Sequence, residues 1–405
     1  MEVKRGYKKT DVGVIPEEWE IRPLLSTVRI ANGQVNPKVE PYKSMILVAP
    51  DHIESSTGKL IAQKTAAEQG AISGKYLFES GDIVYSKIRP YLRKAILADF
   101  SGLCSADMYP LKPSTNISSG YILATVLGNR FSKYAESVSV RSGMPKINRA
   151  EMADFVLAVP PPPEQRAIAT ALSDMDALIA GMNKLISKKR DLKQAAMQQL
   201  LTGKTRLPGF SGKWEVKRLG DVAEMRSGGT PPSSVPAYYD GDIPWVSISD
   251  MTKGGKVLLS TDRNLTQAGF KNSAAQMFPE GTVLYAMYAS LGECSIAGIT
   301  LCSSQAILGI QPKDKLNGEF LYYFLTSLKT LVKSMGQQGT QANLNKGMVQ
   351  DFQLSLPTLP EQTAIAEVLS DMDAEIATLE ARLEKTRSLK QGMMQELLTG
   401  RIRLV

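Results

Sequence analysis

The chain has 405 residues, 43% of them hydrophobic and 22% charged, which suits two soluble globular units of about 100–200 residues each. It holds no run of about 20 apolar residues that could cross a membrane, and its charged N-terminus lacks the apolar core of a signal peptide, so we expect a cytoplasmic protein. The formal net charge of +8 favours polyanionic partners such as nucleic acid, although many basic proteins bind none.

The first globular unit is expected over residues 1–160, and it contains a short basic stretch. Lys87, Arg89 and Arg93 lie there among the aromatic residues Tyr85 and Tyr91. Such cations bind phosphate, and arginine can also pair with guanine through two hydrogen bonds. The stretch is a candidate DNA contact; an exposed basic turn without a ligand explains it equally well.

A glycine-bearing loop closes this unit. It carries two further candidate DNA-binding cations, Arg141 and Lys146, just before Ile147-Asn148-Arg149. A polar surface loop is the alternative interpretation.

A long helix is predicted over residues 161–204. Apolar residues recur there at alternating spacings of four and three, which places them in one seam along the helix. They are Ile168, Leu172, Met175, Ile179, Met182 and Ile186. Prolines precede the seam and Gly203 follows it, as is typical of a helix start and a helix end. At about 40 residues, the helix would be roughly 60 Å long and could act as a ruler.

The second globular unit is expected over residues 205–357, and two of its segments could contact DNA. Around Gly228-Gly229, backbone N–H groups could approach phosphate beside Arg226 and Thr230. A later loop offers amide side chains that match the hydrogen-bonding edge of adenine, followed by a lysine, although a polar surface loop without a ligand explains it nearly as well. These are Gln338, Gln341, Asn343 and Lys346. His52 and Trp245 are interpreted as packing residues.

A second long helix is predicted over residues 358–405, and it repeats the first. A shift of 197 residues superimposes residues 164–207 on residues 361–404, with 26 of 44 positions identical. The same seam recurs at Ile365, Leu369, Met372, Ile376, Leu379 and Leu383. The two seams could pack against each other, although a domain spacer or a dimerisation coil would show the same pattern.

The N-terminal segment, residues 1–24, resembles residues 205–219, so each helix is followed by the same kind of segment. The halves therefore show a circular, head-to-tail pseudo-symmetry. By contrast, residues 25–140 and 220–335 share only a skeleton, such as Tyr85 against Tyr285. We predict a mixed α/β (α+β) protein with two domains of similar fold, joined by two long helices in an antiparallel coiled coil with one domain near each end.

Motifs for catalysis are missing. Gly203-Lys204-Thr205 ends like a phosphate loop, but it lies at a helix end and lacks the earlier glycine. No nuclease, dinucleotide-binding or methyltransferase motif is present. The three cysteines and the single histidine do not form a zinc motif of the usual kind, so structural thiols and no metal site are expected.

The paired segments Pro-Glu-Gln, Leu-Ser-Asp-Met-Asp-Ala, Leu-Lys-Gln and Leu-Leu-Thr-Gly resemble the conserved regions of type I restriction–modification specificity subunits. Asp154-Phe155 and Asp351-Phe352, just before these segments, resemble them too. The resemblance covers essentially the whole chain. Its specificity comes from the motif set occurring twice at this spacing.

The resemblance implies two target-recognition domains that read the halves of an asymmetric bipartite site in double-stranded DNA. It implies that the helices set the gap and dock two methyltransferase (modification) subunits, and that this chain is not an enzyme and binds no cofactor. S-adenosylmethionine would be bound by the methyltransferase subunits, and ATP and Mg²⁺ by restriction/translocase subunits. The competing hypothesis is a non-catalytic coiled-coil scaffold whose two domains bind other ligands.

Overall fold

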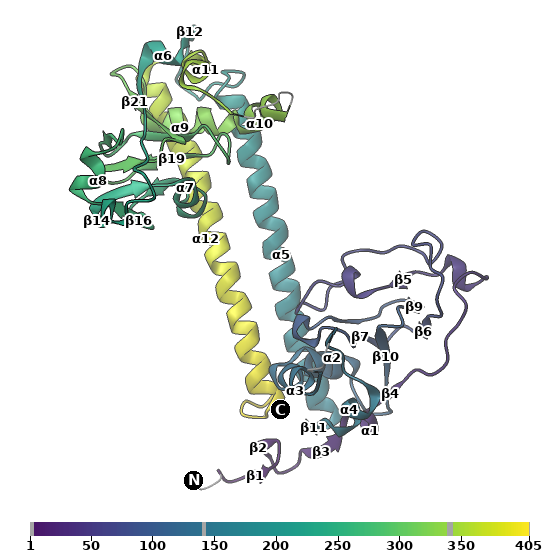
Figure 1. The fold of residues 1–405 in the computed structure, drawn as a ribbon. Helices are drawn as coiled ribbons and strands as arrows, with labels where there is room; N and C mark the ends of the chain where they lie inside the picture. The colour runs from purple at the N-terminus through teal and green to yellow at the C-terminus, as the bar shows by residue number, and fades with distance from the viewer. Residues whose placement is uncertain (1–3, 140–142, 338–342, 405) are drawn as a thin grey trace. The chain divides into compact units, whose positions relative to one another are not determined.

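The computed structural model describes residues 4–139, 143–337 and 343–404. The chain divides into two compact units (Figure 1): unit 1 comprises Met1–Lys184 with Ala381–Val405, and unit 2 comprises Leu185–Glu380. The two long helices, α5 (Pro162–Leu200) and α12 (Leu359–Leu398), each contribute residues to both units. None of the helices in the described part of the chain combines the length and apolar character needed to cross a bilayer.

Unit 1 is built on two small sheets. The first is antiparallel, in the order β4 (Val28–Ile30), β10 (Met108–Pro113), β7 (Ile83–Ser86) and β8 (Ala95–Leu97). The second has the order β5 (Leu47–Val48), β9 (Gly102–Cys104) and β6 (Tyr76–Phe78). Two strand pairs lie outside these sheets: β1 (Tyr7–Thr10) with β2 (Gly13–Pro16), and β3 (Glu20–Pro23) with β11 (Val156–Val159). The shorter α-helices are α1 (Leu24–Thr27), α2 (Ser119–Leu127), α3 (Asn129–Ser139) and α4 (Arg149–Asp154).

Unit 2 repeats these two sheets with one strand added to each, and its described residues contain no counterpart of the β1–β2 pair. Its first sheet has the order β13 (Ala223–Ser227), β21 (Ile307–Pro312), β18 (Val283–Ala286), β19 (Cys294–Ala297) and β15 (Val257–Leu258). Its second has the order β16 (Arg263–Leu265), β14 (Tyr239–Val246), β20 (Leu301–Ser303) and β17 (Met277–Phe278). A further pair joins β12 (Glu215–Arg218) to β22 (Gln353–Leu356). The shorter α-helices are α6 (Leu219–Val222), α7 (Ile248–Gly254), α8 (Gln267–Lys271), α9 (Gly318–Ser327), α10 (Lys329–Gln337) and α11 (Lys346–Gln350).

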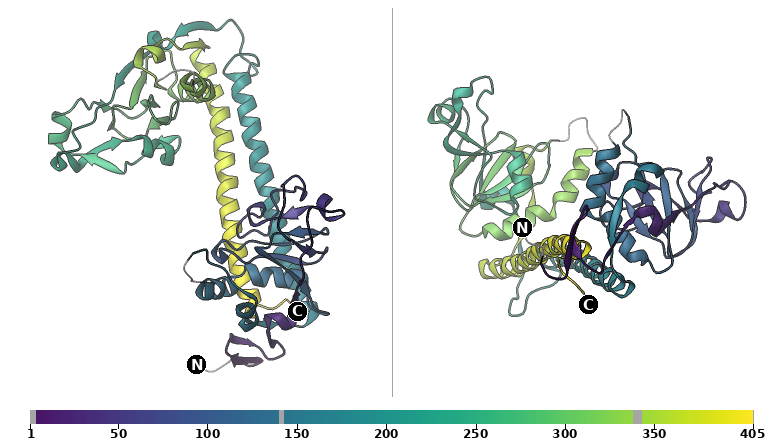
Figure 2. Two further views of the ribbon diagram at one scale, coloured as in Figure 1. Left: turned by 45° about the vertical axis from the view of Figure 1, so that its right-hand side comes forward. Right: turned by 90° about the horizontal axis from the view of Figure 1, so that it is seen from below.

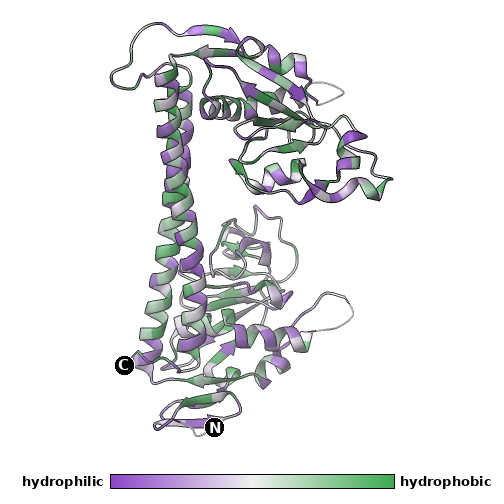
Figure 3. Ribbon diagram, turned by 90° about the vertical axis from the view of Figure 1, so that its left-hand side faces the viewer, coloured by the Kyte–Doolittle hydropathy of each residue, from purple (hydrophilic) through white to green (hydrophobic). Residues whose placement is uncertain are grey.

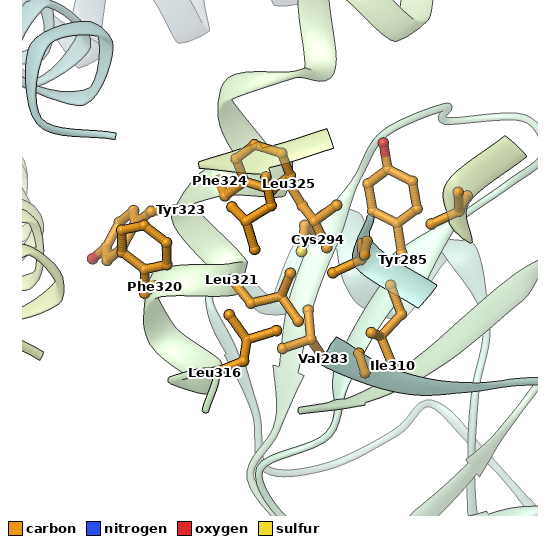
Figure 4. Packing of buried hydrophobic residues seen from close by; sticks show 14 of the residues in the cluster. Val283, Tyr285, Cys294, Ile310, Leu316, Phe320, Leu321, Tyr323, Phe324 and Leu325 are labelled. Carbon is orange, nitrogen blue, oxygen red and sulfur yellow. The ribbon is translucent and has the colours of Figure 1, made fainter. Parts of the chain in front are cut away.

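The core of each unit joins its first sheet to the long helices. In unit 1, Tyr85 of β7 and Ile122 of α2 are buried in one cluster with Ile168 and Leu172 of α5. In unit 2, the corresponding cluster joins β18 and α9 to both long helices. Figure 4 shows the side chains that β18 and α9 contribute to it. Burial of these apolar side chains is the main source of stability, so each long helix is an integral part of both domain cores.

Within each unit the two long helices run antiparallel. In unit 1, Asp176 of α5 binds Lys390 of α12 (Oδ1 to Nζ, 2.5 Å), and Met182 lies against Thr386. In unit 2, Lys189 binds Glu375 (Nζ to Oε1, 2.6 Å). Residue numbers thus rise along one helix where they fall along the other (Figure 2), and polar and apolar residues are interspersed along both (Figure 3). The expected mixed α/β fold with two similar domains and an antiparallel helix pair is confirmed.

The residues of the predicted seams occupy two kinds of environment. The first two residues of each seam lie in a domain core, because helices α2 and α9 cover the starts of α5 and α12. These residues are Ile168, Leu172, Ile365 and Leu369. Further along the helices, Met182, Ile186, Ile376 and Leu383 are buried, and Met175, Ile179, Met372 and Leu379 are partly buried. The spacing of a seam alone does not distinguish helix–helix packing from helix–domain packing.

Candidate nucleic-acid interface

In unit 1 the fold brings the two predicted basic segments together. The chain leaving β7 pairs with the loop before α4, because Arg89 N donates to Pro145 O (2.8 Å) and Ile147 N donates to Lys87 O (2.9 Å). Ile88 and Lys146 form an isolated antiparallel bridge between these hydrogen bonds. Lys87, Arg89 and Lys146 therefore share one edge of the domain, whereas Arg141 lies outside the described residues.

The turn that carries the arginines is conformationally unusual. Arg89 and Arg93 both have φ of 48°, in the left-handed region that costs a residue with a side chain about 1 kcal/mol or more. Unit 2 has two left-handed residues in the equivalent turn, Ala289 (φ 58°) and Gly292 (φ 75°). Both domains therefore have two left-handed residues in this turn, four residues apart in unit 1 and three apart in unit 2, and these residues are cationic only in unit 1.

The side chains of this turn differ in their surroundings. Arg89 and Tyr91 are exposed. Arg93 is partly buried, and its Nε donates to Ser132 Oγ of α3 (2.9 Å). We therefore assign the accessible chemistry of the turn to Arg89 and Tyr91, with Arg93 linking the turn to α3.

An aromatic ring between two cations extends this surface. The Lys87 ammonium lies 5.2 Å from the centre of the Tyr109 ring, and the Arg149 guanidinium lies 5.5 Å from it. Arg149 is held in place by Asn32 Oδ1 and Ala31 O, both 2.6 Å away. Sequence reasoning left these contacts out, because β4, β10 and α4 meet only in the fold. The Asn148-Arg149 repeat at Asn345-Lys346 was the available signal.

In unit 2 the same pairing supports a different set of side chains. Leu344 N donates to Met287 O (3.0 Å), as Ile147 does to Lys87 in unit 1. Asn343 and Lys346 are exposed beside this pairing, as is Tyr288. Gln338 and Gln341 lie outside the described residues.

The expectation that the backbone N–H groups of Gly228 and Gly229 bind phosphate is wrong. Gly228 N donates to Ile307 O (3.0 Å) and Gly229 N donates to Ser303 O (2.8 Å), so neither N–H is free for phosphate. A Cβ on Gly229 would lie 2.2 Å from Ala274 C, which shows that a glycine is needed here for close packing. The side chains beside the pair remain as predicted contacts: Arg226 is exposed, and Thr230 Oγ1 accepts from Gln305 N (3.3 Å).

An exposed arginine on the second sheet of unit 2 was not anticipated. The Arg263 guanidinium lies 4.2 Å from the centre of the Tyr239 ring and 5.9 Å from that of Trp245. Trp245 is buried, and its Nε1 donates to Gly229 O (3.0 Å), in keeping with a packing role. His52 is buried too, and its Nδ1 accepts from Ala49 N (3.3 Å).

The thiols of the described chain are buried and unpaired with one another. Burial raises the pKa of Cys302 to about 12, and burial likewise raises the pKa of Cys104 and of Cys294. A thiol with so high a pKa is a poor nucleophile and a poor metal ligand at neutral pH. Across the described residues, no group of three or more His, Cys, Asp or Glu side chains could hold a metal ion.

Comparison with known proteins gives one consistent result. The family model described as type I restriction modification DNA specificity domain matches residues 16–188 and again residues 211–386. The type I restriction enzyme MjaVIII specificity subunit of Methanocaldococcus jannaschii is 25% identical, over 96% of this chain and 94% of that protein. The type I restriction enzyme EcoDI specificity subunit of Escherichia coli is 32% identical, over 49% of this chain and 45% of that protein.

Among solved structures, a chain from a study of complex assembly and conformational transition in a type I R-M system has a TM-score of 0.66. The alignment covers 96% of this chain and 99% of that one, at 20% identity. At this level of identity the likeness shows a shared fold.

Proposed function

Because the chain belongs to the family of type I restriction–modification DNA specificity domains, we propose that it reads an asymmetric, two-part DNA sequence. Each domain reads one half of the site. The chain directs methylation and restriction that partner subunits carry out, and it has no catalytic role of its own.

The main support for this proposal is that the turn after β7 in unit 1 and the equivalent turn after β18 in unit 2 have different side chains. Unit 1 has Lys87 and the exposed Arg89 where unit 2 has the buried Met287 and the exposed Ala289. Arg89 and Ala289 are both left-handed, and the hydrogen bond from Ile147 N to Lys87 O has its counterpart from Leu344 N to Met287 O. Direct readout depends on side chains that match the edges of particular bases. Two readers with unlike side chains on one framework suit a site whose halves differ.

The contacts divide by chemistry. In unit 1, Lys87, Arg149 and Lys146 supply charge for phosphate, and the exposed Arg89 can reach guanine. In unit 2, Asn343 has the donor and acceptor pair that suits adenine. The finer assignment of Arg93, Arg226, Thr230, Gln338, Gln341 and Lys346 to bases or phosphates stays a prediction.

Exposed leucines on the long helices support the docking of two methyltransferase subunits. In unit 2, Leu185 and Leu192 of α5 are 41% and 46% exposed and seven residues apart, so they share one helix face. In unit 1, Leu389 of α12 is 58% exposed. Apolar side chains in a row on a water-facing helix are typical of a surface that binds another helix. The partners would then supply S-adenosylmethionine, ATP and Mg²⁺.

The test is the genomic methylation pattern of a host that expresses the partner methyltransferase. We expect deletion of this gene to abolish methylation at one split motif and restoration of the gene to recover it. An unchanged pattern in the deletion strain would remove the proposal. Replacing Leu192 by glutamate should abolish the same methylation by preventing partner binding, which co-purification with the methyltransferase subunit measures.

A further inference from the structure

A hydrogen-bonded polar cluster links the recognition domain of unit 2 to both long helices. The phenol of Tyr323 on α9 donates to Asp373 Oδ2 of α12 (2.8 Å) and lies 3.1 Å from Ser370 Oγ. Lys193 of α5 forms an ion pair with the other carboxylate oxygen of Asp373. Lys256, which precedes β15, donates to Ser370 Oγ (2.7 Å) and to the Tyr323 phenol (3.2 Å).

Tyr323 is well placed to transmit the orientation of the helices to the domain. Its side chain is fully buried, and its neighbours Phe320 and Leu321 lie in the domain core. Figure 4 shows the Tyr323 hydroxyl directed away from Leu321 and Cys294. The ring is thus anchored in the domain, while the hydroxyl is bound to α12. A buried hydroxyl without its partner is costly, so the cluster favours one orientation of the domain on the helices.

Unit 1 keeps one half of this cluster and lacks the other. Helices α2 and α9 correspond, because their N-cap residues receive the same contact: Gln165 Oε1 accepts from Ser118 N, and Gln362 Oε1 accepts from Asn317 N. Six residues after the N-cap, unit 2 has Tyr323 and unit 1 has Ala124.

The helix-to-helix contact is retained in unit 1. Asp176 and Lys390, which repeat Asp373 and Lys193, form the same ion pair. Ala124 has no side-chain hydroxyl and cannot donate a hydrogen bond to Asp176 as Tyr323 does to Asp373. Hence the contact between the helices is common to both units, and the tyrosine link from domain to helices is present in unit 2 only.

We propose that Tyr323, together with Lys256, is a positioning residue that sets the angle of the second recognition domain on its helices, and thereby the distance at which its half-site is read. This inference rests on the proposed function. The cluster joins the domain to α5 and α12, so we expect it to govern the gap between half-sites and to leave the choice of bases within each half unchanged.

The test compares DNA duplexes that carry the motif with its natural gap or with one base pair added or removed. Methylation by the complete complex with its methyltransferase subunits is measured for each duplex. We expect Tyr323→Phe to lower the preference for the natural gap at least threefold, without changing the preferred bases. Lys256→Met should act in the same direction. Unchanged gap preference in both variants, or altered base preference, would overturn the inference.

Tyr121→Phe is the matched control. Tyr121 is an equally buried tyrosine on α2, but its hydroxyl donates to Ala158 O (2.6 Å) within the domain. It should keep the natural gap preference even if its thermal stability falls as much as that of Tyr323→Phe. A relaxed gap preference in this control would show general loosening and would contradict the inference. If the wild-type complex has no gap preference, the proposed function itself fails.

Discussion

Arg89 combines an exposed charge with a backbone conformation that disfavours side chains. We predict that Arg89→Gly weakens DNA binding by the assembled complex by about 1–3 kcal/mol, because a phosphate or guanine contact is lost. Stability should change by less than about 1 kcal/mol, since relief of the left-handed strain and the added freedom of the unfolded chain oppose each other. Fluorescence anisotropy with a duplex carrying the motif measures the first effect, and urea unfolding the second.

Ala289→Gly is the control for this prediction, since Ala289 has the same conformation in unit 2 without a charge. It should leave DNA binding unchanged. Wild-type affinity in Arg89→Gly would exclude Arg89 as a contact.

Two buried glutamates make equivalent contacts in the two units. Glu164 accepts from Trp19 Nε1 (2.9 Å) and from Arg403 Nη2 (2.8 Å), and Glu361 accepts from Trp214 Nε1 (3.1 Å) and Arg206 Nη2 (2.7 Å). Removing Glu164 leaves the buried Trp19 N–H without its acceptor and leaves Arg403 with Glu18 as its remaining ion-pair partner. We predict that Glu164→Ala lowers the free energy of unfolding by about 3 kcal/mol, measured by urea unfolding.

The exposed pair Arg22–Glu20 gives the comparison for that value. Glu20→Ala should lower the free energy of unfolding by less than about 1 kcal/mol, because water screens both charges. Equal effects of the two substitutions would show that burial of Glu164 adds nothing.

At the scale of single residues, the sequence predicted which residue types could contact DNA better than it predicted which residues surround them in the fold. The cationic stretch at residues 87–93 and the cations before α4 were recognisable as candidate contacts from residue type alone. That Lys87 and Arg149 both lie over Tyr109 could not be read from the sequence. The pairing of β7 with β10 brings Lys87 to Tyr109, and hydrogen bonds to Ala31 and Asn32 hold Arg149 there. The prediction that Gly228 and Gly229 bind phosphate failed, because a glycine needed for close packing and a phosphate-binding glycine look alike in a sequence.

The pairing of the long helices can be tested by exchanging charges. Asp176→Lys should destabilise unit 1 by about 1 kcal/mol, because it places two cations opposite each other at Lys390. Adding Lys390→Asp should restore most of the loss, giving a coupling energy of about 1 kcal/mol in a double-mutant cycle followed by urea unfolding. Additive losses in the double variant would mean that these residues do not meet.

The helices were the elements most open to sequence prediction, and the strands the least. A seam repeated over six positions is a strong signal for a helix, and its recurrence 197 residues later excludes chance. Strands such as β5 and β15 have two residues each, too few for any periodicity to develop. Their pairing is decided by packing against the rest of the domain.

For the molecule as a whole, the circular relation of the halves appears directly in the contacts of the glutamates. In unit 2, Arg206 and Trp214 come from one continuous stretch after α5. In unit 1, the equivalent Arg403 and Trp19 come from opposite ends of the sequence. The likeness of residues 1–24 to residues 205–219 predicted this relation. Which bases each domain reads could not be predicted, because the recognition segments share no side-chain pattern.

Separate cores imply that the two recognition domains can be exchanged independently. The sheets of unit 1 and of unit 2 bury their side chains in different clusters. We predict that replacing residues 25–140 by those of a family member with another specificity changes one half of the methylated motif. The gap should stay the same, since both long helices and Tyr323 are unaltered. Sequencing of methylated genomic DNA measures both.

The reciprocal exchange of residues 220–335 distinguishes the roles of domain and helices. It should change only the other half of the motif, and because it removes Tyr323 it should also broaden the gap unless the incoming domain supplies an equivalent hydroxyl. A change in both halves from either exchange would contradict the division of labour between the domains. If exchange of residues 25–140 broadened the gap between half-sites, then unit 1 would control that gap rather than the contact of Tyr323 with α12.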